Sequence, residues 1–219
     1  MYTVGLVIFP GSNCDKETYD FLQTYVGVKV NKIWHKDTHI KPHDLYVLPG
    51  GFSYGDYLRP GKLASMSPAL VEIKQHVRDK DRKILGICNG FQILCEIGLL
   101  PGTLRENNNL QFICKLVTIS DGSETYQIPI AHGDGNYYHP NPEELDVAYR
   151  YVDNPNGSTD DIAGIYNFKR NVLGMMPHPE RAFKSFHESK DGFKIFENFA
   201  KGALWLESHY QNLIILQIL

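Results

Sequence analysis

KILGICNGFQIL, residues 83–94, begins as a short apolar run and continues with a different hydrophobic period. The run from Ile84 to Ile87 has the length of a buried strand, whereas apolar residues recur at helical spacing from Phe91 onward. Gly98 then supplies a helix stop. The pattern therefore predicts that a strand turns sharply into a helix at Cys88.

The pentad Gly86-Ile87-Cys88-Asn89-Gly90 has the spacing of a nucleophile elbow, with a thiol as the nucleophile. Glycines on both sides relieve crowding in so tight a turn. The helix that follows directs its positive dipole end at the thiol, which favours thiolate, and the Asn89 amide can donate to an oxyanion. The pentad alone leaves a second interpretation open, namely a structural cysteine packed in a core strand.

A histidine and an acid follow another apolar run, in Pro177-His178-Pro179-Glu180. Each proline pushes the preceding residue toward extended geometry, in which residues two apart face the same side. A carboxylate beside an imidazole fixes its tautomer and stabilises its charged form. Although a surface histidine beside an acid is common, the elbow and this pair together predict a Cys88, His178 and Glu180 triad.

Other candidate groups lack such surroundings. Cys14 falls in the first turn of a predicted helix and could compete as nucleophile, but we expect it to be a packing residue near the site. His132 is a second candidate for the base. His35, His39 and His43 recur at four-residue spacing in a polar stretch that reads as a solvated loop, without a ligand-like order. The sequence therefore predicts no metal site.

Composition narrows the class of protein. The 219 residues are 42% hydrophobic, and 22 basic against 25 acidic residues give a net charge of −3, which does not favour nucleic acid or anionic membranes. Four cysteines without paired spacing do not suggest a disulfide framework. No signal-peptide pattern or apolar run of about 20 residues is visible. We expect a cytoplasmic protein with a single domain over residues 1–219.

Strands alternate with helices in the first half, which predicts a parallel sheet covered on both faces. Sites in such sheets lie at the carboxyl ends of the strands, where the loops after residues 9, 48 and 87 meet. Ser12 with Asp15 resembles a capping box for the first helix. Predicted strands cover residues 3–9, 28–34, 45–48, 84–87, 112–119, 125–131, 147–152, 161–167 and 172–176. Predicted helices begin near 15, 68 and 89, and a last one spans 191–208.

The second half is expected to extend the same sheet and to add a smaller antiparallel one. A faint phosphate-loop pattern from Gly55 to Lys62 is rejected, because five residues separate its glycines and Leu63 replaces the required Ser or Thr. The glycine-rich loop Gly50–Asp56 can instead present N–H groups to an anion. The apolar tail Asn212–Leu219 is expected to dock on its own domain, with contact to a partner as the alternative.

With these stretches in hand, the chain resembles the class I, triad-type glutamine amidotransferases. The cysteine elbow and His-Pro-Glu are typical of that superfamily. A set of more specific sequence motifs resembles the family of glutaminase subunits (PurQ) of phosphoribosylformylglycinamidine synthase. It comprises PGSNCD (10–15), LPGGFSYGDYLR (48–59), GICNGFQIL (86–94), IAG (162–164) and NVLGMMPHPER (171–181).

The resemblance implies a flavodoxin-like three-layer α/β sandwich, with a mostly parallel central sheet, helices on both faces and a smaller antiparallel sheet. It implies that Cys88 is the nucleophile, His178 the general base and acid, and Glu180 the orienting carboxylate. The oxyanion donors would be the amide of Asn89 and one from Gly51 or Phe52. Gln92 would lie near the amino-acid end of the substrate.

The resemblance also implies a reaction and partners. The chain would hydrolyse L-glutamine to L-glutamate and ammonia for a separate ATP-dependent synthetase subunit (PurL type) of de novo purine biosynthesis, with a small accessory subunit (PurS type). No cofactor is expected in this chain, and ATP and Mg would bind the synthetase. A shorter segment from Ile119 to Gln127 and the apolar end after Tyr210 depart from the family pattern and bear on partner contacts.

Two alternatives remain at this stage. One is a free-standing thiol hydrolase, such as a γ-glutamyl hydrolase or a peptidase, which would need no partner. The other is a catalytically silent subunit that keeps the fold for assembly. The presence of Cys88, His178 and Glu180 argues against the silent subunit.

Overall fold

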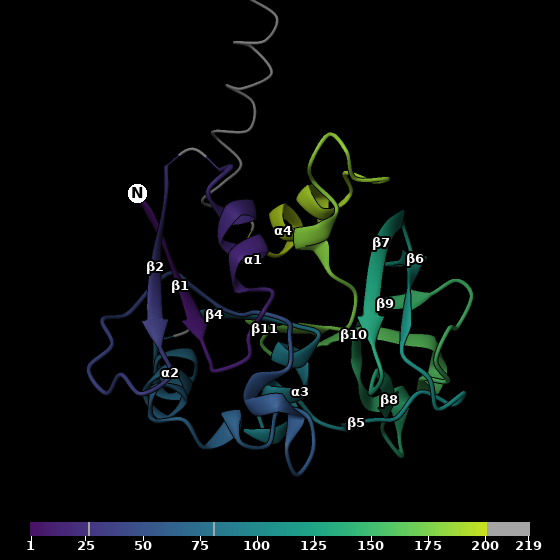
Figure 1. The fold of residues 1–219 in the computed structure, drawn as a ribbon, viewed down its shortest axis with the longest axis horizontal. Coiled ribbons are helices and arrows are strands. Elements are labelled where there is room, and N and C mark those ends of the chain that lie inside the picture. Colours follow the sequence, from purple (N-terminus) through teal and green to yellow (C-terminus); the bar gives the residue numbers. More distant parts are fainter. Residues whose placement is uncertain (26, 81, 201–219) are drawn as a thin grey trace, which may run out of the picture.

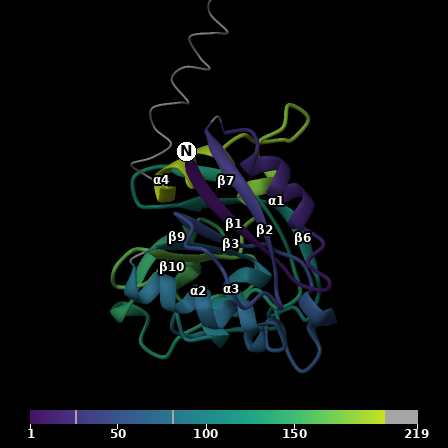
Figure 2. The ribbon, with the colours of Figure 1, turned by 90° about the vertical axis from the view of Figure 1, so that its left-hand side faces the viewer.

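A nine-stranded sheet forms the centre of the protein, whose computed structural model describes residues 1–25, 27–80 and 82–200. Helices cover both faces, α1 and α4 on one and α2 and α3 on the other (Figure 1; Figure 2). The strands of the sheet are β1 (Tyr2–Ile8), β2 (Val28–Trp34), β3 (Leu45–Leu48), β4 (Lys83–Ile87), β6 (Ile113–Ser120), β7 (Thr125–His132), β9 (Asp146–Tyr151), β10 (Ile162–Tyr166) and β11 (Val172–Met175). The helices are α1 (Asp15–Leu22), α2 (Pro68–Asp79), α3 (Asn89–Glu96) and α4 (Gly192–Ala200).

The strand order is β2-β1-β3-β4-β11-β10-β9-β6-β7. The five strands from β2 to β11 run parallel, as the alternation of strands and helices predicts. Residues of β3 are buried throughout and those of β4 nearly so, which explains why both read as continuous apolar runs. The carboxyl ends of β1, β3, β4 and β11 therefore meet at one edge of the sheet.

The second half extends this sheet with β10, β9, β6 and β7, all antiparallel to their neighbours. A separate two-stranded antiparallel sheet pairs β5 (Thr103–Arg105) with β8 (Asn136–Tyr138). The predicted extension and the predicted small sheet are both confirmed. The strands of the small sheet escaped detection because each has only three residues, too few to show a period.

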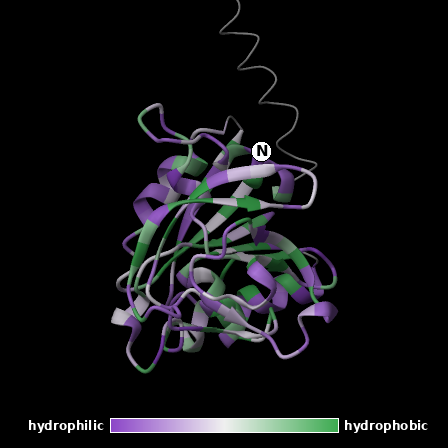
Figure 3. Ribbon diagram, turned by 90° about the vertical axis from the view of Figure 1, so that its right-hand side faces the viewer, coloured by the Kyte–Doolittle hydropathy of each residue, from purple (hydrophilic) through white to green (hydrophobic). Residues whose placement is uncertain are grey.

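Hydrophobic residues concentrate on the strands and on the helix faces turned toward them (Figure 3). On one side, the Phe21 ring of α1 lies 5.6 Å from the Phe193 ring and 5.5 Å from the Phe196 ring of α4, which joins the first and last helices. On the other side, a Cβ at Gly90 would lie 2.1 Å from the Leu48 carbonyl oxygen. Helix α3 thus rests directly on β3.

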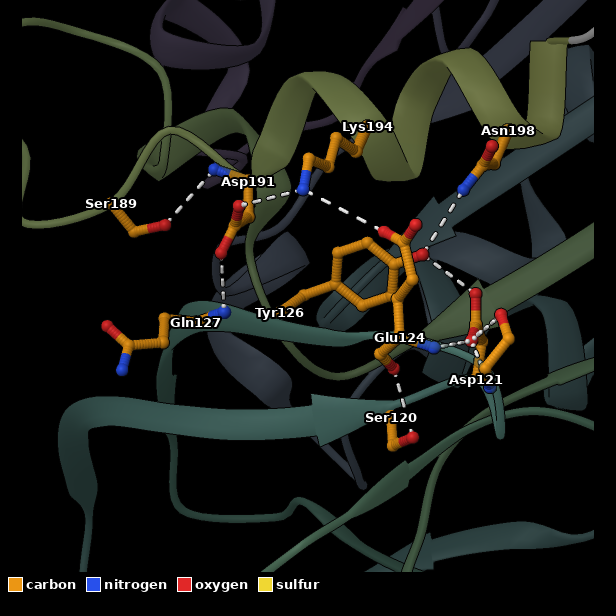
Figure 4. A network of polar contacts seen from close by, with 10 residues as sticks. Ser120, Asp121, Glu124, Tyr126, Gln127, Ser189, Asp191, Lys194 and Asn198 are labelled. Carbon is orange, nitrogen blue, oxygen red and sulfur yellow. Dashed lines mark hydrogen bonds and ion pairs between the residues drawn. The ribbon is translucent and has the colours of Figure 1, made fainter.

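A polar network joins α4 to the turn between β6 and β7 (Figure 4). The Tyr126 hydroxyl donates to Asp121 Oδ2 at 2.7 Å and accepts from Asn198 Nδ2 at 3.4 Å. Lys194 Nζ lies 3.8 Å from Glu124 Oε2. The short segment from Ile119 to Gln127 therefore consists of two strand ends and the tight turn at residues 121–124, and it is bonded to the last described helix.

Four local expectations need correction or fall outside the described residues. The predicted capping box is wrong, because Ser12 Oγ accepts from the Phe9 N–H inside the loop and Cys14 takes the N-cap position of α1. The loop with His35 and His43 is not a solvated one at those positions, since both side chains are buried. The end of the last predicted helix and the tail Asn212–Leu219 lie outside the described residues.

Candidate active site

Cys88 occupies a strained turn between β4 and α3. Its φ is 51° and its ψ is −105°, a conformation that residues other than glycine rarely adopt. A Cβ at Gly86 would lie 2.6 Å from the Gly90 carbonyl, so only glycine allows the helix to start so close to the strand. The predicted strand-turn-helix is confirmed, and it presents Cys88 at the carboxyl edge of the sheet.

His178 reaches the same edge from the neighbouring strand. Strand β11 pairs in parallel with β4, with Met175 opposite Ile87, and the Cys88 N–H donates to the Met175 carbonyl at 2.8 Å. His178 Nδ1 and Glu180 Oε1 lie 2.6 Å apart, and the side chains are 1% and 0% exposed. The structure thus joins the predicted histidine and acid by a buried hydrogen bond beside the elbow.

The pKa of His178 is raised, which favours its protonated, imidazolium form. Burial by itself lowers the pKa of His178, but the Glu180 carboxylate and then Cys88 raise it by more, so the net shift is upward. Cys88 raises the pKa of His178 through its charge, and His178 Nε2 forms no hydrogen bond with the described residues. The Cys88 Sγ itself lies 3.8 Å from the Ala131 carbonyl oxygen. The arrangement suits a thiolate next to an imidazolium.

The predicted oxyanion donors belong to the start of α3 and to the loop after β3, both at this edge. Asn89 is the first residue of α3, so its N–H has no acceptor within the helix. The Phe52 N–H donates to the Gly11 carbonyl at 3.0 Å. Gly51 has a φ of 126°, in the region that favours glycine. Of the two alternatives after β3, the Phe52 N–H is therefore engaged, whereas the Gly51 N–H has no acceptor among the residues that the structure describes.

Gln92 is committed to hydrogen bonds with the protein. Its Oε1 accepts from Asn89 Nδ2 at 2.9 Å, and its Nε2 donates to the Asp134 carbonyl at 2.8 Å. It thereby ties α3 to the loop after β7. Burial, followed by the charge of Asp134, raises the pKa of Asp56 to about 6 on this side of the site. The two carboxyl groups can balance a positively charged group of a bound molecule.

His132 lies at the end of β7 and differs in charge from His178. Its Nδ1 hydrogen-bonds Asn107 Oδ1 at 3.0 Å, and it has no carboxylate partner among the described residues. Burial, followed by the charge of His178, lowers its pKa to about 4, so the ring is neutral. His178, with its bound carboxylate, is therefore the better placed base.

Cys14 lies close to the histidine and the acid, as the sequence predicts. Its Sγ, a ring nitrogen of His178 and a carboxylate oxygen of Glu180 all lie within 4.8 Å of one another. Arg181 Nη2 donates to this sulfur at 3.0 Å. Sequence reasoning missed the Arg181 contact, for which the arginine directly after His-Pro-Glu was the available signal.

Comparison with protein-family models matches residues 2–205 to the CobB/CobQ-like glutamine amidotransferase domain. The chain belongs to this family. A chain in the structure of PurLQS from Thermotoga maritima is 40% identical, with a TM-score of 0.84, and the match covers 90% of this amidotransferase and 97% of that chain. The resemblance drawn from the sequence is therefore confirmed, and the protein is a glutamine amidotransferase.

Two more distant structures share the fold of this amidotransferase. A putative GMP synthase subunit from Thermoplasma acidophilum is 19% identical, with a TM-score of 0.65, and 91% of this chain and 92% of that chain are covered. A glutamine amidotransferase from Thermotoga maritima is 16% identical, with a TM-score of 0.58 and 94% and 88% covered. Within residues 1–25, 27–80 and 82–200, no helix has the length and apolar character needed to cross a membrane.

Proposed function

We propose that this amidotransferase is a PurQ-type glutaminase subunit. It hydrolyses L-glutamine and supplies the ammonia to a PurL-type, ATP-dependent synthetase subunit that makes phosphoribosylformylglycinamidine in de novo purine biosynthesis. The observation that carries the proposal is the buried 2.6 Å contact between His178 and Glu180 at the edge where Cys88 stands. The 40% identity to a chain of PurLQS supports this subunit over other amidotransferases.

The first half of the reaction forms a thioester. Cys88 gives its proton to His178, and the thiolate attacks the side-chain amide carbon of glutamine. The carbonyl electron pair moves onto oxygen, where the N–H groups of Asn89 and Gly51 donate to it. His178 then returns the proton through Nε2 to the amide nitrogen, which leaves as ammonia while the γ-glutamyl thioester remains on Cys88.

The second half consumes one water. The water attacks the thioester carbonyl carbon while His178 Nε2 takes its proton. Collapse of this intermediate breaks the C–S bond, glutamate leaves, and the proton returns to the sulfur of Cys88. Glu180 keeps Nδ1 protonated throughout, so that Nε2 alone exchanges the proton.

A partner is required because the reaction makes ammonia and this chain shows no recognisable nucleotide-binding motif with which to use it. The PurL-type synthetase, holding ATP and Mg, would receive the ammonia, and a PurS-type accessory subunit would complete the assembly. If the loop around Gly51 becomes fully ordered only on docking, the isolated subunit hydrolyses glutamine slowly.

The test is amidination by the purified complex with glutamine or with ammonia as nitrogen source. We expect Cys88→Ala to abolish the glutamine-dependent reaction and to leave the ammonia-dependent reaction intact. A diazo-oxo-norleucine-type electrophile should label Cys88. Full glutamine hydrolysis by the isolated chain, unaltered by the synthetase, would instead indicate a free-standing thiol hydrolase, and absence of labelling would indicate a silent subunit.

A further inference from the structure

The catalytic acid has one oxygen for which the mechanism gives no partner. Glu180 is fully buried, and its Oε1 is engaged with His178 Nδ1 at 2.6 Å. Its Oε2 is buried without a hydrogen bond. Leaving a charged oxygen dry and unpaired is costly, so a nearby donor is needed.

The Cys14 thiol lies beside this carboxylate, and in this structure the two do not form a hydrogen bond. Its sulfur belongs to the group of atoms within 4.8 Å that includes a carboxylate oxygen of Glu180. Because Arg181 Nη2 donates to the sulfur at 3.0 Å, a sulfur lone pair is used and the S–H remains free to point elsewhere. Burial, followed by the charge of Glu180, raises the pKa of Cys14 to about 12, so the thiol keeps its proton.

Neighbouring backbone fixes where this thiol sits. Cys14 is the N-cap residue of α1, and its carbonyl accepts from the Thr18 N–H at 3.0 Å and the Thr18 hydroxyl at 2.7 Å. Gly50 packs against the same atoms: a Cβ there would lie 2.7 Å from His178 Cε1 and 3.4 Å from Cys14 Sγ. Helix α1 and the loop after β3 thus pack around the Cys14 thiol and hold it beside His178 and Glu180.

We propose that Cys14 is a positioning residue, whose thiol beside the buried Glu180 carboxylate helps to keep that carboxylate on His178. The proposal rests on the proposed roles of Cys88, His178 and Glu180. No ion pair joins Arg181 to Glu180 in the described part of the chain. A direct pair would draw the carboxylate away from His178, whereas the intervening thiol keeps the guanidinium close without that competition.

The test compares Cys14→Ala, Cys14→Ser and Cys14→Val in the complete complex, alone and combined with Glu180→Gln. Serine keeps a donor, whereas valine fills the space without one. We expect the Ala and Val variants to lower kcat for glutamine hydrolysis roughly 5- to 10-fold with KM unchanged, the scale of one weak hydrogen bond to a charged group. Serine should recover most of the rate, and none should matter in the Glu180→Gln background.

A second readout does not depend on glutamine. The alkylation rate of Cys88 by iodoacetamide, located by mass spectrometry, should fall in the Ala and Val variants and recover in the Ser variant. Exposed Cys114→Ser is the matched thiol control and should change neither rate. If only the hydrolysis of glutamine fails in the wild-type protein, the proposed substrate is wrong while the role of Cys14 stands.

Two outcomes would overturn the positioning role. Wild-type rates in Cys14→Val would show that the thiol only fills space. If the double variants lose kcat by the full product of the two single losses, Cys14 acts independently of the Glu180 carboxylate. Melting temperatures measured for every variant separate either result from simple unfolding.

Discussion

Glu180 raises the pKa of the His178 imidazole from a position that solvent does not reach. Its carboxylate offsets the burial that would otherwise keep His178 neutral. A buried charge of this kind acts strongly because little water screens it. At the scale of single residues, the proposed chemistry would therefore depend as much on the acid as on the two groups that exchange the proton.

Glu180→Gln should leave the shape of the site intact and remove its charge. We expect kcat for glutamine hydrolysis to fall about 10²- to 10⁴-fold, as when the acid of other triads is neutralised. The pKa of His178 should fall as well, which an NMR titration of the imidazole measures. Glu188→Gln, an exposed acid on the following segment, is the control and should keep the wild-type rate.

The raised pKa of His178 also makes stability depend on pH. Above about pH 6.5 the unfolded chain releases the His178 proton, whereas the folded state keeps it. The stabilisation of the folded state by this proton is therefore complete below about pH 6.5 and is lost as the pH rises through the raised pKa of His178. The free energy of unfolding changes by at most about 1.4 kcal/mol per pH unit through this one group. Urea unfolding of the wild type and His178→Gln should give free energies whose difference shrinks from pH 6.5 to 9.5; a constant difference would contradict the shift.

Helix α3 carries the elbow because it lies unusually close to the sheet. Gly90 faces the Leu48 carbonyl and Gly86 faces the Gly90 carbonyl, so two strands and the helix meet where no side chain fits. The same closeness orients the first N–H groups of the helix toward the site. At the scale of elements, packing and chemistry are therefore set by the same glycines.

Gly90→Ala should separate α3 from β3. A Cβ only 2.1 Å from the Leu48 oxygen forces the helix to move, so we expect a loss of about 1–3 kcal/mol or more in the free energy of unfolding, together with loss of activity. Gly133→Ala is the control, because a Cβ there meets nothing nearer than Phe112 at 4.0 Å. Equal unfolding free energies for the two variants would rule out this explanation of the elbow.

Exposed apolar residues lie on the loop after β3, near the candidate site. Tyr57 and Leu58 are 74% and 82% exposed, and Phe52 and Phe112, both partly exposed, bring their rings to 6.3 Å. The loop that carries Phe52, Tyr57 and Leu58 also contains residues other than glycine at positive φ, including Asp56 and Leu58. Exposed apolar side chains and stored strain beside a site are typical of a surface that a partner covers.

Leu58→Asp should therefore weaken binding of the PurL-type synthetase at least about tenfold, a scale usual for charge placed in an interface core. Glutamine-dependent amidination should fall, while the melting temperature of the isolated chain stays the same. Phe168→Asp is the control, because the turn between β10 and β11 lies at the opposite edge of the sheet. Equal binding losses in both variants would contradict the assignment of this face.

Local patterns were sufficient for the parts of this protein that depend on local backbone rules. The glycines of the elbow and the prolines around His178 act on their immediate neighbours, so strand, turn and paired side chains could be predicted from them. The Ser12 cap was predicted wrongly for the complementary reason. Its hydroxyl could accept a hydrogen bond either from the first turn of the helix or from the preceding loop, and in the structure it accepts from the Phe9 N–H of the loop.

The amino-acid sequence by itself determined which groups are candidates for chemistry and that parallel strands would bring their ends together. Only the tertiary structure decided that Arg181 donates to the Cys14 sulfur, and that the Gly11 carbonyl accepts the Phe52 N–H, so that of the two candidates after β3 only the Gly51 N–H lacks an acceptor among the described residues. These contacts join loops whose proximity comes from the strand order and the packing of helices on the sheet. Hydrophobic period and turn residues describe neighbours along the chain, whereas such contacts depend on which distant strands lie next to each other.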